Sequence, residues 1–190
     1  EQFVINDIAG SSEVNTVSFQ SESGDSTAVM LRYNGVIVNL KHAMYINFRG
    51  IGFNGSYGLA LDNYSNHINI EHCYFTDCYY ALRVITGSHD IRISSTGFYG
   101  GSCAIALENG IQEIEVQNNV FNQNSGIVAN SSRNVVIDGN QFNNCPTGVH
   151  FYIIRNSVIR NNRFNTLSQS GISLEYSDTL SVYNNYIYTY

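Results

Sequence analysis

Residues 135–142 read VVIDGNQF, and the same arrangement returns along most of the chain. Each copy has two apolar residues two positions apart, then a short polar turn and one large apolar residue. The large residue recurs at intervals of 21 to 23 residues, at Phe53, Phe75, Phe98, Phe121, Phe142, Phe164 and Ile187. A fixed period of this size predicts a solenoid, in which successive coils stack on one another.

A second apolar strand follows each turn and completes the coil, as in residues 126–129 (GIVA) and 171–174 (GISL). No stretch has an apolar period of 3.6 residues over helical length, which excludes a helical repeat. The pattern therefore predicts an all-β protein, a right-handed parallel β-helix of roughly eight coils. We expect one module over residues 1–190, with regular coils over 46–190. Residues 1–45 should form less regular coils, with a turn at Asn34–Gly35 between two strands.

Stacking converts each repeated position into a column, with neighbouring members about 4.8 Å apart. The large apolar residues should form an internal stack of rings. The position two residues earlier is held by Cys73, Thr96, Asn119, Asn140, Asn162 and Asn185. We expect its four asparagines to form a ladder of side-chain amides that satisfies backbone groups in the turns. The most regular residues of this sequence are therefore expected to be structural.

Composition narrows the classes of partner. Charged residues make up 13% of the chain, against about 25% in ordinary globular proteins. The net charge is −6 and no cluster of Lys and Arg is present, which argues against nucleic acid as a partner. No apolar run approaches the roughly 18 residues of a spanning helix, so membrane insertion is not expected. The chain opens without Met on a strand-like segment, and we expect it to be a piece of a longer protein with flanking domains.

Four cysteines, Cys73, Cys78, Cys103 and Cys145, are too few and too irregular for a disulfide scaffold. Cys73 with Cys78, or Cys78 with Cys103, are the pairs near enough to form a bridge. The favoured interpretation is four buried free thiols that pack as small apolar residues.

The repeats resemble a known superfamily. Residues 68–75 (INIEHCYF) and 135–142 are similar to the right-handed parallel β-helix repeats of the pectate-lyase-like superfamily. Residues 1–21 and 46–53 resemble modules of large secreted surface proteins of Bacteroidetes-type bacteria. The resemblance covers the whole chain and implies an extracellular or cell-surface protein with a polysaccharide or cell-surface glycan as partner. It leaves activity open, because the superfamily contains lyases, hydrolases, esterases, phage tailspikes and non-catalytic adhesins.

Acids and histidines gather in one part of the repeat frame. The densest set is Glu71, His72 and Asp77, with Asp62, His67 and Arg83 expected on neighbouring turns. Candidate catalytic residues are Glu71, Asp77, Arg83 and Glu108. Asp62 and Glu108 should lie two coils apart, about 10 Å, near the upper limit for an inverting glycosidase pair.

No cofactor is expected in a non-catalytic module. If the chain were a lyase, Asp62, Glu71 and Asp77 would be the Ca²⁺ ligands, because lyases of this kind need clustered carboxylates. The Asp cluster and base of such a lyase cannot be matched residue by residue to this sequence. The five histidines also lack HxH or HExxH spacing.

Aromatic residues give a further indication of function, since the chain has 14 Tyr and no Trp. Outward tyrosines beside Asn and Asp suit stacking on sugar rings and hydrogen bonding to hydroxyls. The candidate substrate-binding residues are Tyr64, His72, Tyr79 and Tyr80. The favoured function is a non-catalytic stalk that contacts carbohydrate or acts in adhesion. The alternatives are a polysaccharide lyase or glycoside hydrolase acting in the β-helix groove, and a tailspike-like fibre.

Overall fold

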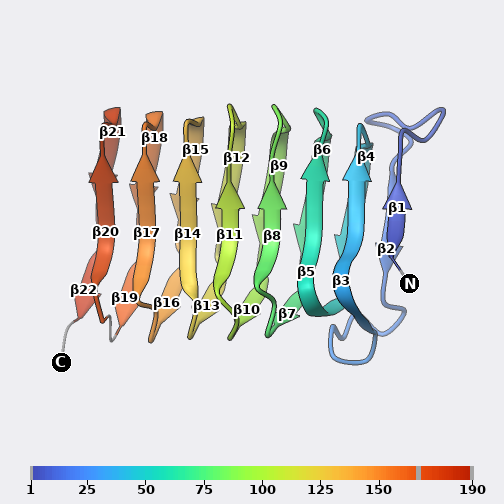
Figure 1. The fold of residues 1–190 in the computed structure, drawn as a ribbon, viewed down its shortest axis with the longest axis horizontal. Coiled ribbons are helices and arrows are strands. Elements are labelled where there is room, and N and C mark those ends of the chain that lie inside the picture. Colours follow the sequence, from blue (N-terminus) through green and yellow to red (C-terminus); the bar gives the residue numbers. More distant parts are fainter. Residues whose placement is uncertain (1, 166–167, 189–190) are drawn as a thin grey trace.

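The computed structural model describes residues 2–165 and 168–188, and it is a parallel β-helix. Figure 1 shows the strands stacked side by side along the longest axis, with β1 and β22 at opposite ends. Every pairing between named strands is parallel, and equivalent residues of successive coils face one another in register. The fold class predicted from the 22-residue period is confirmed.

Each regular coil has three faces, each built by one strand per coil. The first face consists of β2 (Val17–Gln20), β4 (Met44–Arg49), β6 (Asn66–Glu71), β9 (His89–Ser94), β12 (Gln112–Gln117), β15 (Arg133–Asp138), β18 (Arg155–Arg160) and β21 (Asp178–Tyr183). The second face consists of the three-residue strands β7 (Tyr74–Thr76), β10 (Gly97–Tyr99), β13 (Val120–Asn122), β16 (Gln141–Asn143), β19 (Arg163–Asn165) and β22 (Tyr186–Tyr188).

The third face consists of β8 (Tyr80–Val84), β11 (Cys103–Leu107), β14 (Ser125–Asn130), β17 (Thr147–Tyr152) and β20 (Ser170–Glu175). Two longer strands, β3 (Met30–Lys41) and β5 (Gly52–Asp62), run through both the second and the third face. The short β1 (Phe3–Ile5) pairs with β3 at the N-terminal end of the stack.

Corners between the faces are made by residues with left-handed backbone. His72 (φ 52°), Asp77 (φ 55°) and Asn63 (φ 51°) occupy the three corners of one coil, and Gly139 has φ 67° at a later one. Asn and Gly adopt this conformation at low cost, which accounts for their abundance in the sequence.

The interior is a stack of phenylalanine rings, as the repeat column predicts. Phe98, Phe121 and Phe142 are fully buried, with ring centroids 4.9 and 4.6 Å apart and ring planes within 6° of parallel. The column of Gly and Ala on the third face leaves room for these rings. A Cβ added at Gly126, for example, would lie 2.6 Å from Cε1 of Phe142. The small residue at the second position of each short third-face strand is therefore required by packing.

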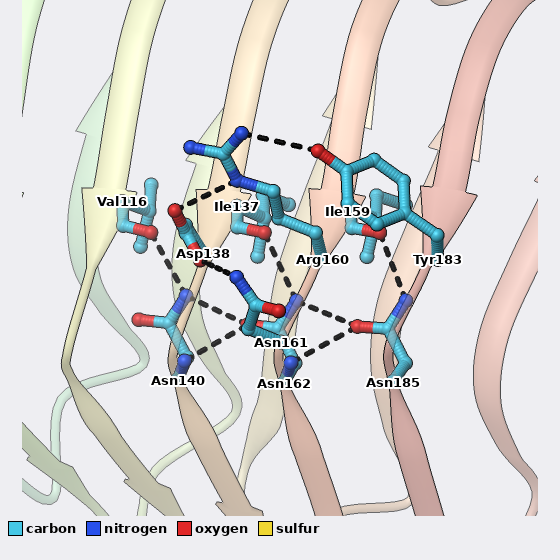
Figure 2. Close-up of polar contacts among 10 residues, drawn as sticks. All are labelled: Val116, Ile137, Asp138, Asn140, Ile159, Arg160, Asn161, Asn162, Tyr183 and Asn185. Atoms are coloured by element: carbon cyan, nitrogen blue, oxygen red, sulfur yellow. Dashed lines mark hydrogen bonds and ion pairs between the residues drawn. The ribbon is translucent and has the colours of Figure 1, made fainter.

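The asparagine ladder, formed by Asn119, Asn140, Asn162 and Asn185, is also confirmed. Figure 2 shows its last three members. The Asn140 Oδ1 accepts from the backbone N–H of Asn119 at 2.9 Å and from its Nδ2 at 3.0 Å. The Asn140 Nδ2 donates to the Val116 carbonyl at 2.8 Å. Each amide thus satisfies turn groups that no strand partner reaches.

The N-terminal coils differ from the expectation at one point. The turn predicted at Asn34–Gly35 is wrong, because β3 continues through it and pairs with β5 on both sides. Asn34 and Gly35 lie opposite the single residue Ser56, so β3 carries one extra residue, and the register shifts between Tyr33 and Val36. A β-bulge absorbs such an insertion without ending the strand, so the Asn-Gly signal here marks a bulge.

All four cysteines are buried free thiols, as the favoured interpretation held. Cys73 stands in the column of the asparagine ladder, and its Sγ lies 3.6 Å from the Phe48 carbonyl. Burial raises the pKa of the Cys73 thiol to about 11 and that of the Cys103 thiol to about 12. Thiols with such high pKa values are poor nucleophiles, so these residues contribute packing.

Candidate functional site

Three tyrosines from neighbouring coils form an aromatic surface at the start of the third face. This tyrosine cluster consists of Tyr57 on β5, Tyr79 in the turn before β8, and Tyr80 at the start of β8. Tyr57 and Tyr80 stack at 5.5 Å because they face one another in the parallel register. Tyr79 packs edge-on against Tyr80 at 4.9 Å and is 56% exposed. The cluster presents an accessible aromatic ring held by two others.

An ion pair lies beside the tyrosine cluster. Arg83 on β8 points outward, and its Nη2 lies 2.9 Å from Oε2 of Glu108 on the next coil. The Arg83 guanidinium is also 5.9 Å from the centre of the Tyr80 ring. The hydrogen bond to Glu108 raises the pKa of Arg83, and burial raises the pKa of Tyr80. Both groups are therefore held in their usual protonation states at neutral pH.

An open cleft of about 500 Å³ adjoins Tyr79 on the side of the second face. Its lining combines polar side chains with backbone, and consists of Arg32, Tyr33, Asn34, Asn54, Gly55, Ser56, Asp77 and Tyr79. The cleft lies where β3 and β5 continue through the corner that later coils make with a turn. An aromatic wall beside hydroxyl, amide, carboxylate and guanidinium groups is suited to a polyhydroxylated ligand.

A second cluster lies on the first face, and sequence reasoning missed it. His67 on β6 contacts Asp90 on β9 through its Nδ1, and its ring packs 4.4 Å from that of Tyr45. These three residues share one left-handed position in successive coils, which turns their side chains outward together. With Arg92 they line a cleft of about 450 Å³. The sequence does contain a signal for this contact. His67 and Asp90 are 23 residues apart, which is one repeat length, so they occupy the same column on successive coils.

The remaining predicted residues lie at different corners of the coil. Glu71, at the end of β6, pairs with Arg49 at 3.4 Å, and His72 follows it at the first corner. Asp77 lies at the second corner, where its Oδ2 accepts from the Thr76 hydroxyl at 3.0 Å. A short strand, β7, separates these two corners, so residues close in sequence are spread around the coil.

Asp62 and Tyr64 belong to the third corner, between β5 and β6. The Asp62 carboxylate accepts from the Asn63 backbone N–H at 2.7 Å, and the Tyr64 ring is 59% exposed. The Asp62–Ile85–Glu108 column follows the strand register, which places one coil between the two acids. Of the predicted catalytic residues, the structure brings Arg83 and Glu108 together.

Across residues 2–165 and 168–188, no three His, Cys, Asp or Glu side chains form a group that could hold a metal ion. Within the same ranges, no helix is long and apolar enough to cross a membrane.

Comparison with known protein families shows which family the chain belongs to. The family model described as "Periplasmic copper-binding protein (NosD)" matches residues 15–189. The chain belongs to the NosD family. The match begins just before β2 and includes every regular coil of the β-helix. The description of NosD as periplasmic agrees with the expected location outside the cytoplasm.

Solved structures with a similar fold act on polysaccharides according to their descriptions. An alginate lyase from Paenibacillus sp. str. FPU-7 superposes with a TM-score of 0.48 and 11% identity, over 93% of this NosD-family chain and 84% of the lyase. The catalytic domain of a GH87 α-1,3-glucanase, in complex with nigerose, gives 0.46 and 10%, over 88% of this chain and 46% of that domain.

A tailspike of Acinetobacter baumannii bacteriophage Fri1, described as a capsular polysaccharide depolymerase, gives a TM-score of 0.43 and 12% identity, over 82% of this chain and 43% of the tailspike. The chain thus spans less than half of the glucanase domain and of the tailspike. Similarity at this level carries no information about activity. No curated protein matches the chain significantly.

Proposed function

We propose that this chain is a non-catalytic β-helix module that contacts carbohydrate outside the cytoplasm, through the tyrosine cluster and the adjoining cleft. The observation that carries the proposal is the position of Tyr79, a half-exposed ring at the edge of a polar cleft. Tyr57 and Tyr80 hold that ring in place, so little conformational entropy is lost when a sugar stacks on it. Asp77, Asn34 and Arg32 line the cleft next to it and can exchange hydrogen bonds with hydroxyls.

Binding can be tested on an array of glycans and then by titration calorimetry. Replacement Tyr79→Ala should weaken binding by about tenfold or more, because aromatic anchors carry most of the energy at such sites. Tyr186→Ala is the matched control, since Tyr186 is 61% exposed on the second face, away from the cluster. The proposal fails if no glycan binds, or if the two variants weaken binding equally.

A second candidate function, a polysaccharide lyase or hydrolase, is favoured by the contact between His67 and Asp90. A carboxylate on Nδ1 orients the imidazole and leaves Nε2 to accept a proton, as a general base requires. Arg92 lines the same cleft and can neutralise an acidic sugar.

Pectins, alginates and glycosaminoglycans, incubated with and without Ca²⁺, would reveal a lyase by the absorbance of unsaturated products. Product formation that disappears in His67→Ala would establish this site. Loss in Asp77→Ala or Arg83→Ala would instead place catalysis on the candidates found in the sequence. Product formation of either kind would overturn the non-catalytic proposal.

Copper is not part of the proposed function, although the family description names it. Copper sites use imidazole, thiolate and thioether ligands. In the part of the chain that the structure describes, the thiols are buried, and no three His, Cys, Asp or Glu side chains gather into a group that could hold a metal ion. These residues do not fit a resident copper ion. We propose a periplasmic or cell-surface location for this module, supported by the family description, and a function without a metal-dependent step.

A further inference from the structure

The third face carries two copies of one arrangement, a basic side chain paired with a glutamate. Arg83 pairs with Glu108, and His150 pairs with Glu175 through an Nε2–Oε1 distance of 3.2 Å. In both pairs the acid follows the base by 25 residues and lies one coil further along the stack. The two bases share one outward column, and the two acids share another. The second pair is therefore the first pair repeated along the axis.

Each pair has tyrosines beside it. Arg83 and Glu108 adjoin the tyrosine cluster, while His150 and Glu175 adjoin Tyr152 and Tyr176, whose rings meet edge-on at 5.4 Å. Tyr176 is 81% exposed and Tyr152 is 36% exposed, so both rings are accessible. Tyr80 begins its strand and Tyr152 ends its strand, so the two aromatic groups lie on a diagonal across the face.

The surface between the two groups lacks charge. The outward positions of the base column there are Ala106 and Val128, and Asn130 stands in the acid column. Three strand steps separate β8 from β17, which corresponds to about 14 Å at the usual spacing of neighbouring strands. A disaccharide is too short to reach both groups, whereas a chain of several sugars can do so.

We propose that the third face binds one extended, neutral polysaccharide chain that is held at both tyrosine-and-ion-pair groups at once. This inference rests on the proposed function and specifies its ligand class. A neutral glycan is favoured because Arg83 and His150 each already face a carboxylate and the whole chain carries a net charge of −6, which disfavours a polyanion. The paired side chains offer donors and acceptors to vicinal hydroxyls, and the half-buried Val128 offers an apolar contact to the sugar ring.

Two linked contacts should make affinity depend on the length of the ligand. Once one end of a chain is held, the second contact forms within the same complex and raises the apparent affinity without a new binding partner. Affinity should therefore rise steeply when the oligosaccharide becomes long enough to span both groups. Ligands shorter than this span should occupy the groups independently.

The experiment titrates the full chain with cello-oligosaccharides from dimer to octamer, and with oligogalacturonates of the same lengths. Tyr79→Ala removes the ring of the first group, Tyr176→Ala removes the ring of the second, and Tyr186→Ala is the control. We expect the Kd for long cello-oligosaccharides to rise about tenfold in either of the first two variants and to be unchanged in the third. Salt should have little effect on these affinities.

The outcomes separate the two proposals. Binding that is independent of length, or insensitive to Tyr176→Ala, would overturn the two-group inference and leave the carbohydrate-contact function intact. Preferential binding of oligogalacturonates would overturn the assignment to neutral glycans. Failure of every oligosaccharide to bind would overturn this inference, whereas the proposed function would fall only if no glycan on the array bound.

Discussion

The corner that follows the first face is built in two ways along the chain. From Asn119 onward, every coil places an asparagine there, and the amides bond to one another from coil to coil. In the earlier coils, Cys73 and Thr96 occupy the same column. The Thr96 hydroxyl accepts from the Cys73 backbone N–H at 3.2 Å and donates to the Ser94 carbonyl.

The difference shows that the coil needs a polar contact at this corner but does not need an amide. Asn119 links the two kinds of corner by a hydrogen bond, because its Oδ1 accepts from the Thr96 backbone N–H at 2.9 Å. The earlier coils make fewer and weaker bonds here, and they also carry the tyrosine cluster, the Arg83–Glu108 pair and the His67–Asp90 contact. The coils from Asn119 onward add the amide ladder, while the earlier coils carry most of these side chains and the His150–Glu175 pair lies among the later ones.

The largest expected effect concerns the thiols, three of which lie in the irregular region. Burial raises the Cys103 pKa from 9.0 to about 12, with the Glu108 charge adding to it, so this thiol stays protonated in the folded protein well above pH 9. Alkylation by iodoacetamide at pH 9 should be at least about a thousandfold slower in the folded protein than in guanidinium, where thiols are exposed and partly ionised. Rapid labelling of the folded protein would show that these coils open readily.

Within the regular region, Asn140→Ala should lower the free energy of unfolding by about 3 kcal/mol. The change removes bonds to the Asn119 backbone, to the Val116 carbonyl and to Asn162, and leaves buried groups unsatisfied. Urea denaturation, followed by circular dichroism, measures the free energy of unfolding. Asn69→Ala is the matched control, because Asn69 points outward on β6. Equal losses in both variants would mean that the ladder adds little to stability.

The corresponding change in the irregular region, Thr96→Ala, should cost about 1 kcal/mol, because it leaves one buried backbone N–H without its hydroxyl acceptor. Thr96→Ser keeps the hydroxyl and should retain most of the stability. The same urea experiment compares the free energies of unfolding of Thr96→Ala and Thr96→Ser. A loss as large as that of Asn140→Ala would remove the distinction between the two kinds of corner.

The smallest effect on stability is expected for Tyr79→Ala, with a change within about 0.5 kcal/mol, because a half-exposed ring contributes little to the core. Thermal unfolding monitored by circular dichroism should therefore give nearly the same midpoint as for the unchanged chain. A marked loss would show that the tyrosine cluster supports the coil, and its proposed role in binding would then need another variant.

Much of the fold followed from the sequence, because a column in the repeat is a column in space. The 22-residue period is sufficient to predict the Phe stack, the asparagine ladder and the register of the Asp62–Ile85–Glu108 column. The bulge at Asn34–Gly35 could not, since the N-terminal coils depart from the repeat and the local signal is the same for a turn and a bulge. The repeat pattern and composition point to Tyr79, Tyr80, Arg83 and Glu108 as candidate site residues, but they do not single out the contact between His67 and Asp90.

The sequence by itself determined which residues share a column, because the period sets position along the axis of the stack. Only the tertiary structure decided where each residue lies around the axis, because that depends on the left-handed corner residues, such as His72 and Asp77, that turn the chain. Those corners separate Glu71 from Asp77 and bring Arg83 to Glu108. They also align the Arg83–Glu108 and His150–Glu175 pairs on one face, three strands apart.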